Sequence, residues 1–261
     1  AIIIILLFYA KIQFMQVSAI KTEKVTLGSI GLFELLNKYV RELSEGSILA
    51  ITSKVISLCE GRAVPVTNSD KDELIKKEAD LYLPKEENRY KLYLTIKDSI
   101  LAVSAGIDES NAAGNYVFWP KDPQRTANEI REYLIKRFNL KKIGVIITDS
   151  KTTPLRWGVT GIPIAHSGFK ALRDLIGTAD LFGRKLKMTK IAVMDALAAS
   201  AAAVMGEGAE QTPLSVITDV PFVEFQDRKP TKKELDELKI AIEDDVYGSI
   251  LKRAPWKKGG G

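Results

Sequence analysis

Two uninterrupted apolar runs, ILAIT at 48–52 and IGVIITD at 143–149, constrain the fold of this 261-residue chain more than any other feature. Apolar runs of this length are typical of buried strands. The second run ends in Asp149, an acid in the position where core strands often lead into an active site. The chain is therefore expected to fold around a sheet that buries these two strands.

Further strands are predicted on both sides of these runs. Alternating apolar and polar residues predict a half-buried strand at 11–19. The segments 90–96 and 100–107 flank a three-residue connection that suits a hairpin. Two more strands are expected at 214–219 and 222–225.

Helices are predicted where apolar residues recur at helical spacing or where capping residues begin a segment. They cover about 32–43, 123–138, 190–205 and 231–247, the last opened by a capping box at Thr231. Regular crossover helices do not separate the strands. The pattern therefore predicts an α+β fold rather than a doubly wound one.

The chain divides into three regions. Residues 1–16 are expected to form an apolar N-terminal strand or a leader, 17–225 the main part of the fold, and 226–261 a C-terminal helix and tail. The opening apolar run is too short for a bilayer span, which needs about 20 residues. It also lacks the basic start and cleavage site of a signal peptide. The glycines at 259–261 resemble a tag remnant and take no part in the predicted fold.

Composition excludes several kinds of protein. The net charge of +5 suits small anionic ligands better than nucleic acid, and no basic cluster interleaved with aromatic residues is present. The single cysteine, Cys59, excludes disulfides and zinc sites built from cysteine, and indicates a reducing compartment such as the cytoplasm. The single histidine, His166, excludes paired-histidine metal sites and is expected to be a satisfied loop residue. Any metal must therefore be held by oxygen ligands, which favours Mg or Mn.

Three short segments combine acids, hydroxyls and small residues: AGIDESN at 105–111, TDS at 148–150 and MGEG at 205–208. Their side chains Asp108, Asp149, Ser150 and Glu207 are hard oxygen ligands. Flanking glycines would let backbone N–H groups approach a phosphate. Each segment taken alone is more typical of an ordinary turn, and composition does not show that the three converge.

Basic residues follow the second of these segments. Arg156 and Arg184 adjoin proline or glycine turns, which makes them candidates for binding a phosphate or a carboxylate. A solvated surface is the alternative for each of them. A phosphate-binding P-loop is absent, and GEGAEQ at 206–211 lacks the third glycine of a dinucleotide fingerprint.

The order of the segments resembles the coenzyme F-420-0:L-glutamate ligase family over about residues 17–220. The resemblance rests on TSKVISLCEGR, AGIDESN, GVIITD, PLRWGVTGIPIAHSG, IGTADLFGRKL and DALAASAAAVMGEG in this order. It implies an α+β fold with a catalytic region at 17–225, and an intertwined homodimer. It also implies ligation of L-glutamate to a carboxylate acceptor through a γ-glutamyl amide bond. It also implies GTP, two Mg²⁺ or Mn²⁺ ions and a potassium ion as cofactors.

The resemblance implies roles for particular residues. Asp108 and Asp149 match the ligands of one metal, and Ser150 and Glu207 those of the second. The residues that match nucleotide contacts are Thr22, Ser53, Lys54, Asn111, Met205, Gly206, Gly208 and Ala209. Arg156 and Arg184 are expected to hold negative charge that develops during catalysis.

Some positions depart from the family pattern. Leu58 stands where the family has lysine, and the 150–153 loop replaces its glycine and arginine with threonines. The resemblance implies a ligase that works through an acyl phosphate, and the altered loop leaves both coenzyme F-420-0 and a reduced folate open as the acceptor. Trp157 offers a flat face for the ring of either acceptor. The alternatives are a degenerate paralogue that binds nucleotide without turnover, and a purely structural dimer.

Overall fold

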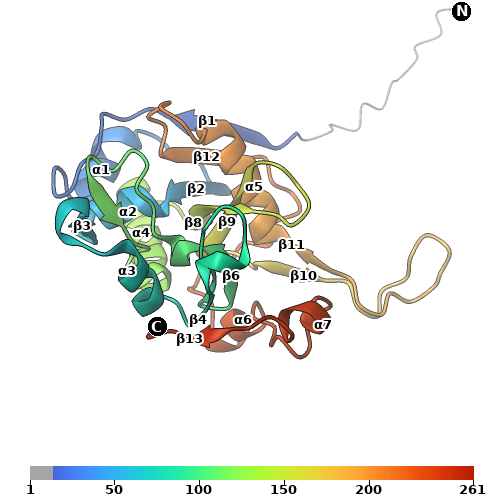
Figure 1. Ribbon diagram of the computed structural model, residues 1–261. Helices are drawn as coiled ribbons and strands as arrows, with labels where there is room; N and C mark the ends of the chain where they lie inside the picture. The colour runs from blue at the N-terminus through green and yellow to red at the C-terminus, as the bar shows by residue number, and fades with distance from the viewer. Residues whose placement is uncertain (1–13) are drawn as a thin grey trace, which may run out of the picture.

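The computed structural model describes residues 14–261 and has one central sheet (Figure 1). Its strands run in the order β1, β12, β2, β8, β9. Their bounds are Gln16–Ile20, Leu214–Thr218, Ser47–Thr52, Ile143–Thr152 and Val159–Ser167, respectively. β2 and β8 pair in parallel, and the other neighbours in this sheet pair antiparallel. This mixture agrees with the predicted α+β class, and the strands predicted at 48–52, 143–149 and 214–219 are confirmed.

Helices cover both faces of the central sheet (Figure 1). In the described residues they are α1 (Leu32–Tyr39), α2 (Ser53–Cys59), α3 (Lys71–Glu78), α4 (Pro123–Phe138), α5 (Val193–Met205), α6 (Lys232–Asp236) and α7 (Gly248–Leu251). Short 3₁₀ turns lie at Val66–Asn68, Lys85–Glu87 and Ser104–Gly106. The predicted helix at 123–138 is confirmed, and the Asp122 carboxylate caps it by accepting from the Arg125 N–H at 2.9 Å. No helix within 14–261 is long and apolar enough to cross a membrane.

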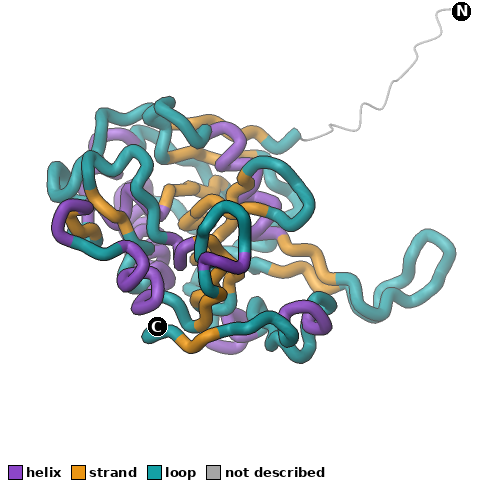
Figure 2. The backbone as a smooth tube through the Cα atoms, viewed as in Figure 1, coloured by secondary structure: helices purple, strands orange, loops and turns teal. Residues whose placement is uncertain are grey.

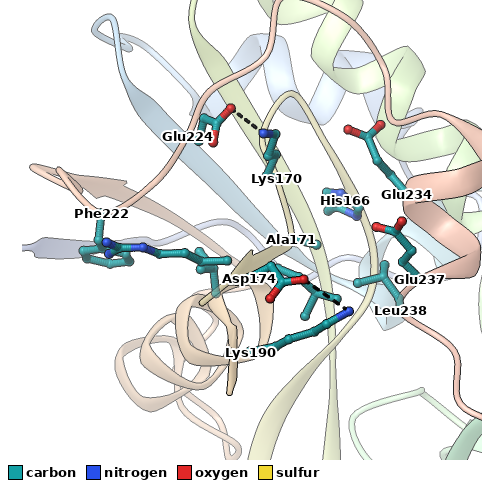
Figure 3. Close-up of a pocket in the computed structure, with 13 residues that line it drawn as sticks. His166, Lys170, Ala171, Asp174, Lys190, Phe222, Glu224, Glu234, Glu237 and Leu238 are labelled. Carbon is teal, nitrogen blue, oxygen red and sulfur yellow. Dashed lines mark ion pairs between the residues drawn. The ribbon is translucent and has the colours of Figure 1, made fainter. Parts of the chain in front are cut away.

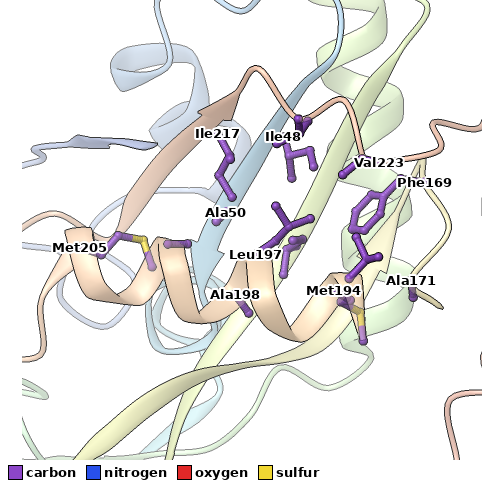
Figure 4. Packing of buried hydrophobic residues seen from close by; sticks show 14 residues of the cluster. Ile48, Ala50, Phe169, Ala171, Met194, Leu197, Ala198, Met205, Ile217 and Val223 are labelled. Atoms are coloured by element: carbon purple, nitrogen blue, oxygen red, sulfur yellow. The ribbon is translucent and has the colours of Figure 1, made fainter. Parts of the chain in front are cut away.

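The two apolar runs are buried because the sheet is covered on both faces. Successive side chains of β2 point to opposite faces, so Ile48 and Ala50 pack with α5, as Figure 4 shows. Leu49 and Ile51 pack with α4 and α1 on the other face. A strand covered on both sides needs apolar residues at every position, which explains the continuous run in the sequence.

Helix α5 packs closely against β9 at Gly161. A Cβ atom on Gly161 would lie 2.5 Å from both the Ala198 carbonyl oxygen and the Ala202 Cβ atom. Only glycine on the strand and alanine on the helix permit this approach. The packing fixes the C-terminal end of α5 beside the β8–β9 hairpin, and this end contributes to the site described below.

A second sheet has the order β13, β4, β5, β6, and β3 pairs separately with β7. The bounds of these strands are Lys257–Lys258, Leu81–Leu83, Leu94–Lys97, Ile100–Val103, Ala63–Pro65 and Asn115–Val117. The predicted hairpin is present, but its connection has two residues instead of three. Asp98 and Ser99 both have positive φ, 50° and 64°, as the tight turn of a two-residue hairpin requires.

The C-terminal glycines belong to the fold, contrary to the prediction. The N–H groups of Gly259, Gly260 and Gly261 donate to backbone carbonyls at the end of α3 and just after it, at 2.9 to 3.0 Å. A Cβ atom on Gly259 would lie 2.0 Å from the Ala79 carbonyl oxygen. The absence of side chains lets the tail satisfy carbonyls that the helix leaves free.

A two-stranded arm extends from the body of the molecule (Figures 1 and 2). β10 (Leu172–Asp174) and β11 (Lys190–Ala192) form its base, and the connection 175–189 carries its tip. Leu181 and Phe182 at the tip are 97% and 95% exposed. Large apolar side chains exposed together are typical of an interaction surface.

Several predicted boundaries are wrong. The predicted helix at 231–247 has its capping box at Thr231, but α6 ends at Asp236 and turns follow. Residues 222–225 form a turn and an isolated bridge rather than a strand. The strand predicted at 11–19 is confirmed from Gln16 onward, whereas residues 14 and 15 are not part of it. Residues 11–13, with most of the predicted N-terminal region, lie outside the described residues.

Two helices are shorter than predicted. The first ends at Tyr39 because Val40 turns to an extended conformation and buries its side chain. The helix predicted at 190–205 starts at Val193, since Lys190–Ala192 pair with the other strand of the arm.

Candidate active site

The candidate site lies where the parallel strands β2 and β8 pass side by side toward their carboxyl ends. Thr52, the last residue of β2, pairs with Thr148 of β8 and leads directly into α2. β8 continues through Asp149 and Ser150 into the hairpin with β9. This edge of a sheet is where ligands commonly bind, because loops and helix N-termini converge there.

A cavity of about 720 Å³ opens at this edge. Its lining comes from segments that are distant in the sequence, within 22–26, 52–58, 103–113, 148–150 and 202–213, together with Val159. The structure brings all the predicted metal and nucleotide residues into it: Thr22, Ser53, Lys54, Asp108, Asn111, Asp149, Ser150, Met205, Gly206, Glu207, Gly208 and Ala209. Segments that could each have been an ordinary turn therefore share one cavity.

Two side chains donate hydrogen bonds to the Asp149 carboxylate, which lines this cavity. The Ser53 hydroxyl donates to its Oδ1 atom at 3.2 Å, and the Trp119 indole N–H donates to its Oδ2 atom. Burial raises the pKa of Asp149 to about 6, and the nearby negative charge of Asp108 adds to this effect. A cation beside this carboxylate would relieve the cost of burying its charge.

The surroundings of Asp108 lower the pKa of its carboxyl, whereas those of Asp149 raise it. Burial alone would raise the pKa of this carboxyl, but the Lys54 ammonium, which lies 2.5 Å from its Oδ2 atom, lowers it below the ordinary value. The backbone N–H and the hydroxyl of Ser110 also donate to it, at 2.8 and 2.9 Å. Asp108 is therefore ionised at neutral pH and lies beside a lysine.

Ser150 and Glu207 form a second pair of oxygen ligands. The Ser150 hydroxyl lies 2.8 and 2.7 Å from the two carboxylate oxygens of Glu207. Glu207 follows Gly206, which ends α5 with φ at +80°. A Cβ atom at Gly206 would meet the Glu210 carboxylate at 2.5 Å, so glycine is needed there for both backbone and space.

The glycine-rich loop after α5 is tied to two other segments of the site. The Asn111 side-chain amide donates to the Gly208 carbonyl at 2.9 Å. The Thr22 N–H donates to the Gln211 carbonyl at 2.8 Å. These bonds join the N-terminal segment, the 105–111 loop and the 205–212 loop into one continuous rim.

The donor set fits divalent cations that are bound together with phosphates. The described residues contain no group of three or more Asp, Glu, His or Cys side chains that could hold a metal alone. They offer instead Asp108 with Asp149, and Ser150 with Glu207, all of which are hard oxygen donors. Mg²⁺ usually takes one or two carboxylates and completes its shell with water and substrate phosphates.

The two predicted arginines do not lie among the residues that line this cavity. Arg156 lies between β8 and β9 at the exposed tip of their hairpin, and Arg184 lies on the arm. Neither pairs with a carboxylate among the described residues. Their predicted catalytic role stays a prediction.

Trp119 is a site residue that the sequence argument missed. Its side chain is only 2% exposed, and its N–H group reaches the Asp149 carboxylate. A Cβ atom on Gly106 would lie 2.1 Å from the indole Nε1 atom. Gly106 in AGIDESN therefore indicated that a large side chain packs against the backbone at this position, although the sequence did not show that this side chain is Trp119.

Figure 3 shows the residues that line a second cavity. This cavity is smaller, about 490 Å³, and shares no lining residue with the first. Its lysines already have partners, since Lys170 lies 2.6 Å from Glu224 and Lys190 lies 3.7 Å from Asp174. His166 borders it from β9 rather than from the predicted loop, and burial lowers its pKa to about 4. The larger cavity, with its acids and glycines, is therefore the better candidate for phosphate chemistry.

Comparison with known proteins finds one family over most of the chain. The family described as F420-0:Gamma-glutamyl ligase matches residues 20–219. A coenzyme F420:L-glutamate ligase from Methanococcus maripaludis is 36% identical over 233 residues, which cover 83% of this chain and 90% of that protein. The protein of the same name from Methanocaldococcus jannaschii is 34% identical, and the match covers 74% of this chain and 83% of that protein. The one from Archaeoglobus fulgidus is 33% identical, and the match covers 85% of this chain and 92% of that protein.

Proposed function

Because this chain belongs to the F420-0:gamma-glutamyl ligase family, whose curated relatives are amide-forming ligases, we propose that it joins L-glutamate to a carboxylate acceptor with GTP and divalent metal. One observation carries the proposal more than any other. Asp108, Asp149, Ser150 and Glu207 come from three separate segments and line one cavity together with the glycine-rich loop. The four oxygen ligands are suited to bind divalent cations, and the backbone N–H groups of the loop are suited to bind the phosphates that those cations carry.

Four side chains are suited to hold two Mg²⁺ or Mn²⁺ ions. Asp108 and Asp149 would hold one ion, and Ser150 and Glu207 the other, with nucleotide phosphates completing both shells. The metals, when bound, neutralise phosphate charge and orient the γ-phosphate for attack. Lys54 supports this assignment, because its ammonium lies beside Asp108 at the edge of the same cavity.

The reaction would proceed in two displacements. An oxygen of the acceptor carboxylate attacks the γ-phosphorus of GTP, and the bond from this phosphorus to the β–γ bridging oxygen breaks. GDP departs, and the acceptor is left as an acyl phosphate. The amine of L-glutamate then attacks the acyl carbon, inorganic phosphate leaves, and the nitrogen loses a proton. Lys54 and the N–H groups of the 205–212 loop would stabilise phosphate charge, so the protein needs no nucleophile of its own.

The acceptor would be coenzyme F-420-0 or a reduced folate. The β8–β9 hairpin extends directly from Asp149 and Ser150, and its tip carries Leu155 and Trp157, which are exposed. An acceptor whose carboxylate reaches the γ-phosphate could lay its ring on Trp157, a stacking contact worth about 1 kcal/mol. The altered 150–153 loop supports a folate as an additional acceptor.

A homodimer is part of the proposal. The arm at 172–192 exposes Leu181 and Phe182 almost completely, and it also exposes Met188. Such side chains on a long projection gain stability when a second copy covers them. The proposal also includes a requirement for K⁺. It places the protein in the cytoplasm, a reducing compartment, because the one thiol of the chain, Cys59, forms no disulfide.

The proposal is tested with purified protein, GTP, Mg²⁺, L-glutamate and separate acceptors. Coenzyme F-420-0 and a reduced folate monoglutamate are each incubated, and products are identified by mass spectrometry while GDP is measured. We expect a glutamylated product and an equal amount of GDP with at least one of the two. GDP formation without any glutamylated product from either acceptor would contradict the ligase proposal for these substrates.

A further inference from the structure

We infer that Trp119 is a positioning residue that orients the Asp149 carboxylate toward a divalent cation; this inference rests on the proposed function. The indole N–H donates to the Oδ2 atom of Asp149, 30 positions away in the sequence. The Ser53 hydroxyl donates to the Oδ1 atom at 3.2 Å. Each carboxylate oxygen therefore accepts a hydrogen bond from a protein side chain, and these two bonds restrict the rotation of the carboxylate group.

The chemistry of the indole limits it to this indirect role. Its nitrogen donates a hydrogen bond and has no lone pair available for a metal. Trp119 is also absent from the residues that line the cavity, so it lies behind Asp149 rather than in the space where a substrate binds. Its effect on a cation must therefore pass through the carboxylate.

The indole has little freedom to move. Its side chain is 2% exposed, and Gly106 leaves no room for even a methyl group between the backbone and Nε1. On its ring, the Lys97 ammonium lies 5.5 Å from the centroid, and Glu78 fixes that ammonium with an ion pair of 2.6 Å. A donor held this firmly keeps Asp149 in one orientation before any ligand arrives.

The inference distinguishes the two pairs of oxygen ligands. Ser150 and Glu207 bond to each other and have no contact with Trp119 among the described interactions. Loss of an outer hydrogen bond to a metal ligand typically lowers metal affinity about 10- to 100-fold. Replacement of Trp119 should therefore weaken one cation site and leave the other unchanged.

The test measures Mn²⁺ binding to the complete chain by electron paramagnetic resonance, with GDP present. Trp119→Phe keeps an aromatic ring but removes the N–H donor. Trp256→Phe is the matched control, because its N–H donates to the Leu251 carbonyl at 2.7 Å in the C-terminal region. We expect Trp119→Phe to weaken one Mn²⁺ site about 10-fold or more, while Trp256→Phe binds as the unaltered protein does.

A second measurement uses the unaltered protein, in case Trp119→Phe does not fold. Indole N–H signals are observed with ¹⁵N-labelled tryptophan and assigned by elimination with Trp157→Phe and Trp256→Phe. The Trp119 signal should exchange slowly with solvent and shift when Mg²⁺ is added with GDP. A folded Trp119→Phe protein with two unchanged Mn²⁺ sites, or a Trp119 signal that Mg²⁺ does not move, would overturn the inference. Failure of the unaltered protein to bind Mn²⁺ would instead overturn the proposed function on which the inference rests.

Discussion

The Ser150 hydroxyl lies 2.8 and 2.7 Å from the two carboxylate oxygens of Glu207, although 57 positions separate the residues in the sequence. The bond joins β8 to the loop after α5, a helix that packs closely against β9 at Gly161. Two hard oxygen ligands are thereby held at the cavity before any phosphate arrives.

Glu207→Gln should lower turnover by at least about 100-fold, because a neutral amide replaces a charged ligand where phosphate charge develops. The Ser150 hydroxyl can still donate to the amide oxygen, so the fold should persist. Steady-state GDP release at saturating Mg²⁺ measures the change, with Glu87→Gln in an exposed 3₁₀ turn as the matched control. Equal rates for both variants would contradict the assignment of Glu207.

Asp108→Asn should also lower turnover about 100-fold and raise the Mg²⁺ concentration needed for half-maximal rate. The amide oxygen can still accept the Ser110 N–H, but the charge that pairs with Lys54 is lost. The control is Asp122→Asn, since asparagine caps helix α4 about as well as aspartate. A near-normal rate with an unchanged Mg²⁺ dependence would remove Asp108 from the proposed metal site.

Stability should fall below pH 6.5 because of His166. Burial lowers its folded-state pKa to about 4, whereas an unfolded histidine titrates near 6.5, so the unfolded state binds more protons between these values. The contribution of the neutral histidine is complete above pH 6.5 and is lost as the pH falls toward 4. Between pH 6.5 and 4.5 it should cost about 2 kcal/mol of unfolding free energy.

Urea unfolding of the original protein and of His166→Gln at both pH values measures this contribution. Glutamine does not titrate, and the carboxylates, including the nearby Glu234, are common to both proteins. The original protein should therefore lose more stability than the variant on acidification. Identical losses would show that His166 is not buried in its neutral form.

The arm should hold two copies together. Light scattering at micromolar concentration should give about twice the chain mass of 28.9 kDa for the original protein. Leu181→Ser combined with Phe182→Ser removes the two most exposed apolar side chains of the tip and should shift the mass toward that of one chain. A mass of 28.9 kDa for the original protein would contradict the dimer, and an unchanged dimer in the variant would exclude the tip as its contact.

Much of the central sheet could be predicted because β2 and β8 are covered on both faces and therefore read as continuous apolar runs. The C-terminal end of α6 could not be predicted from the sequence. A capping box defines where a helix begins, whereas its length depends on apolar contacts, and Ile240 and Val246 beyond it are largely exposed. The helix accordingly stops at Asp236.

The members of the site were predictable, but their arrangement was not. The types of residue at Asp108, Asp149 and Glu207 indicated oxygen ligands, and a resemblance to a family grouped them. Hydrogen bonds between distant segments, such as that from Trp119 to Asp149, leave no periodic pattern in the sequence. A tryptophan beside a proline appears in the sequence only as one more core residue.

Transfer of ¹⁸O from the acceptor tests the central claim most directly. A carboxylate acceptor that carries ¹⁸O in the reacting carboxyl group is incubated with the protein, GTP, Mg²⁺ and L-glutamate, and both product and inorganic phosphate are analysed by mass spectrometry. Ligation through an acyl phosphate predicts a glutamylated product and one ¹⁸O atom in each phosphate released. Glutamylated product with unlabelled phosphate would contradict the acyl-phosphate route, and unlabelled phosphate with no product would contradict ligation itself.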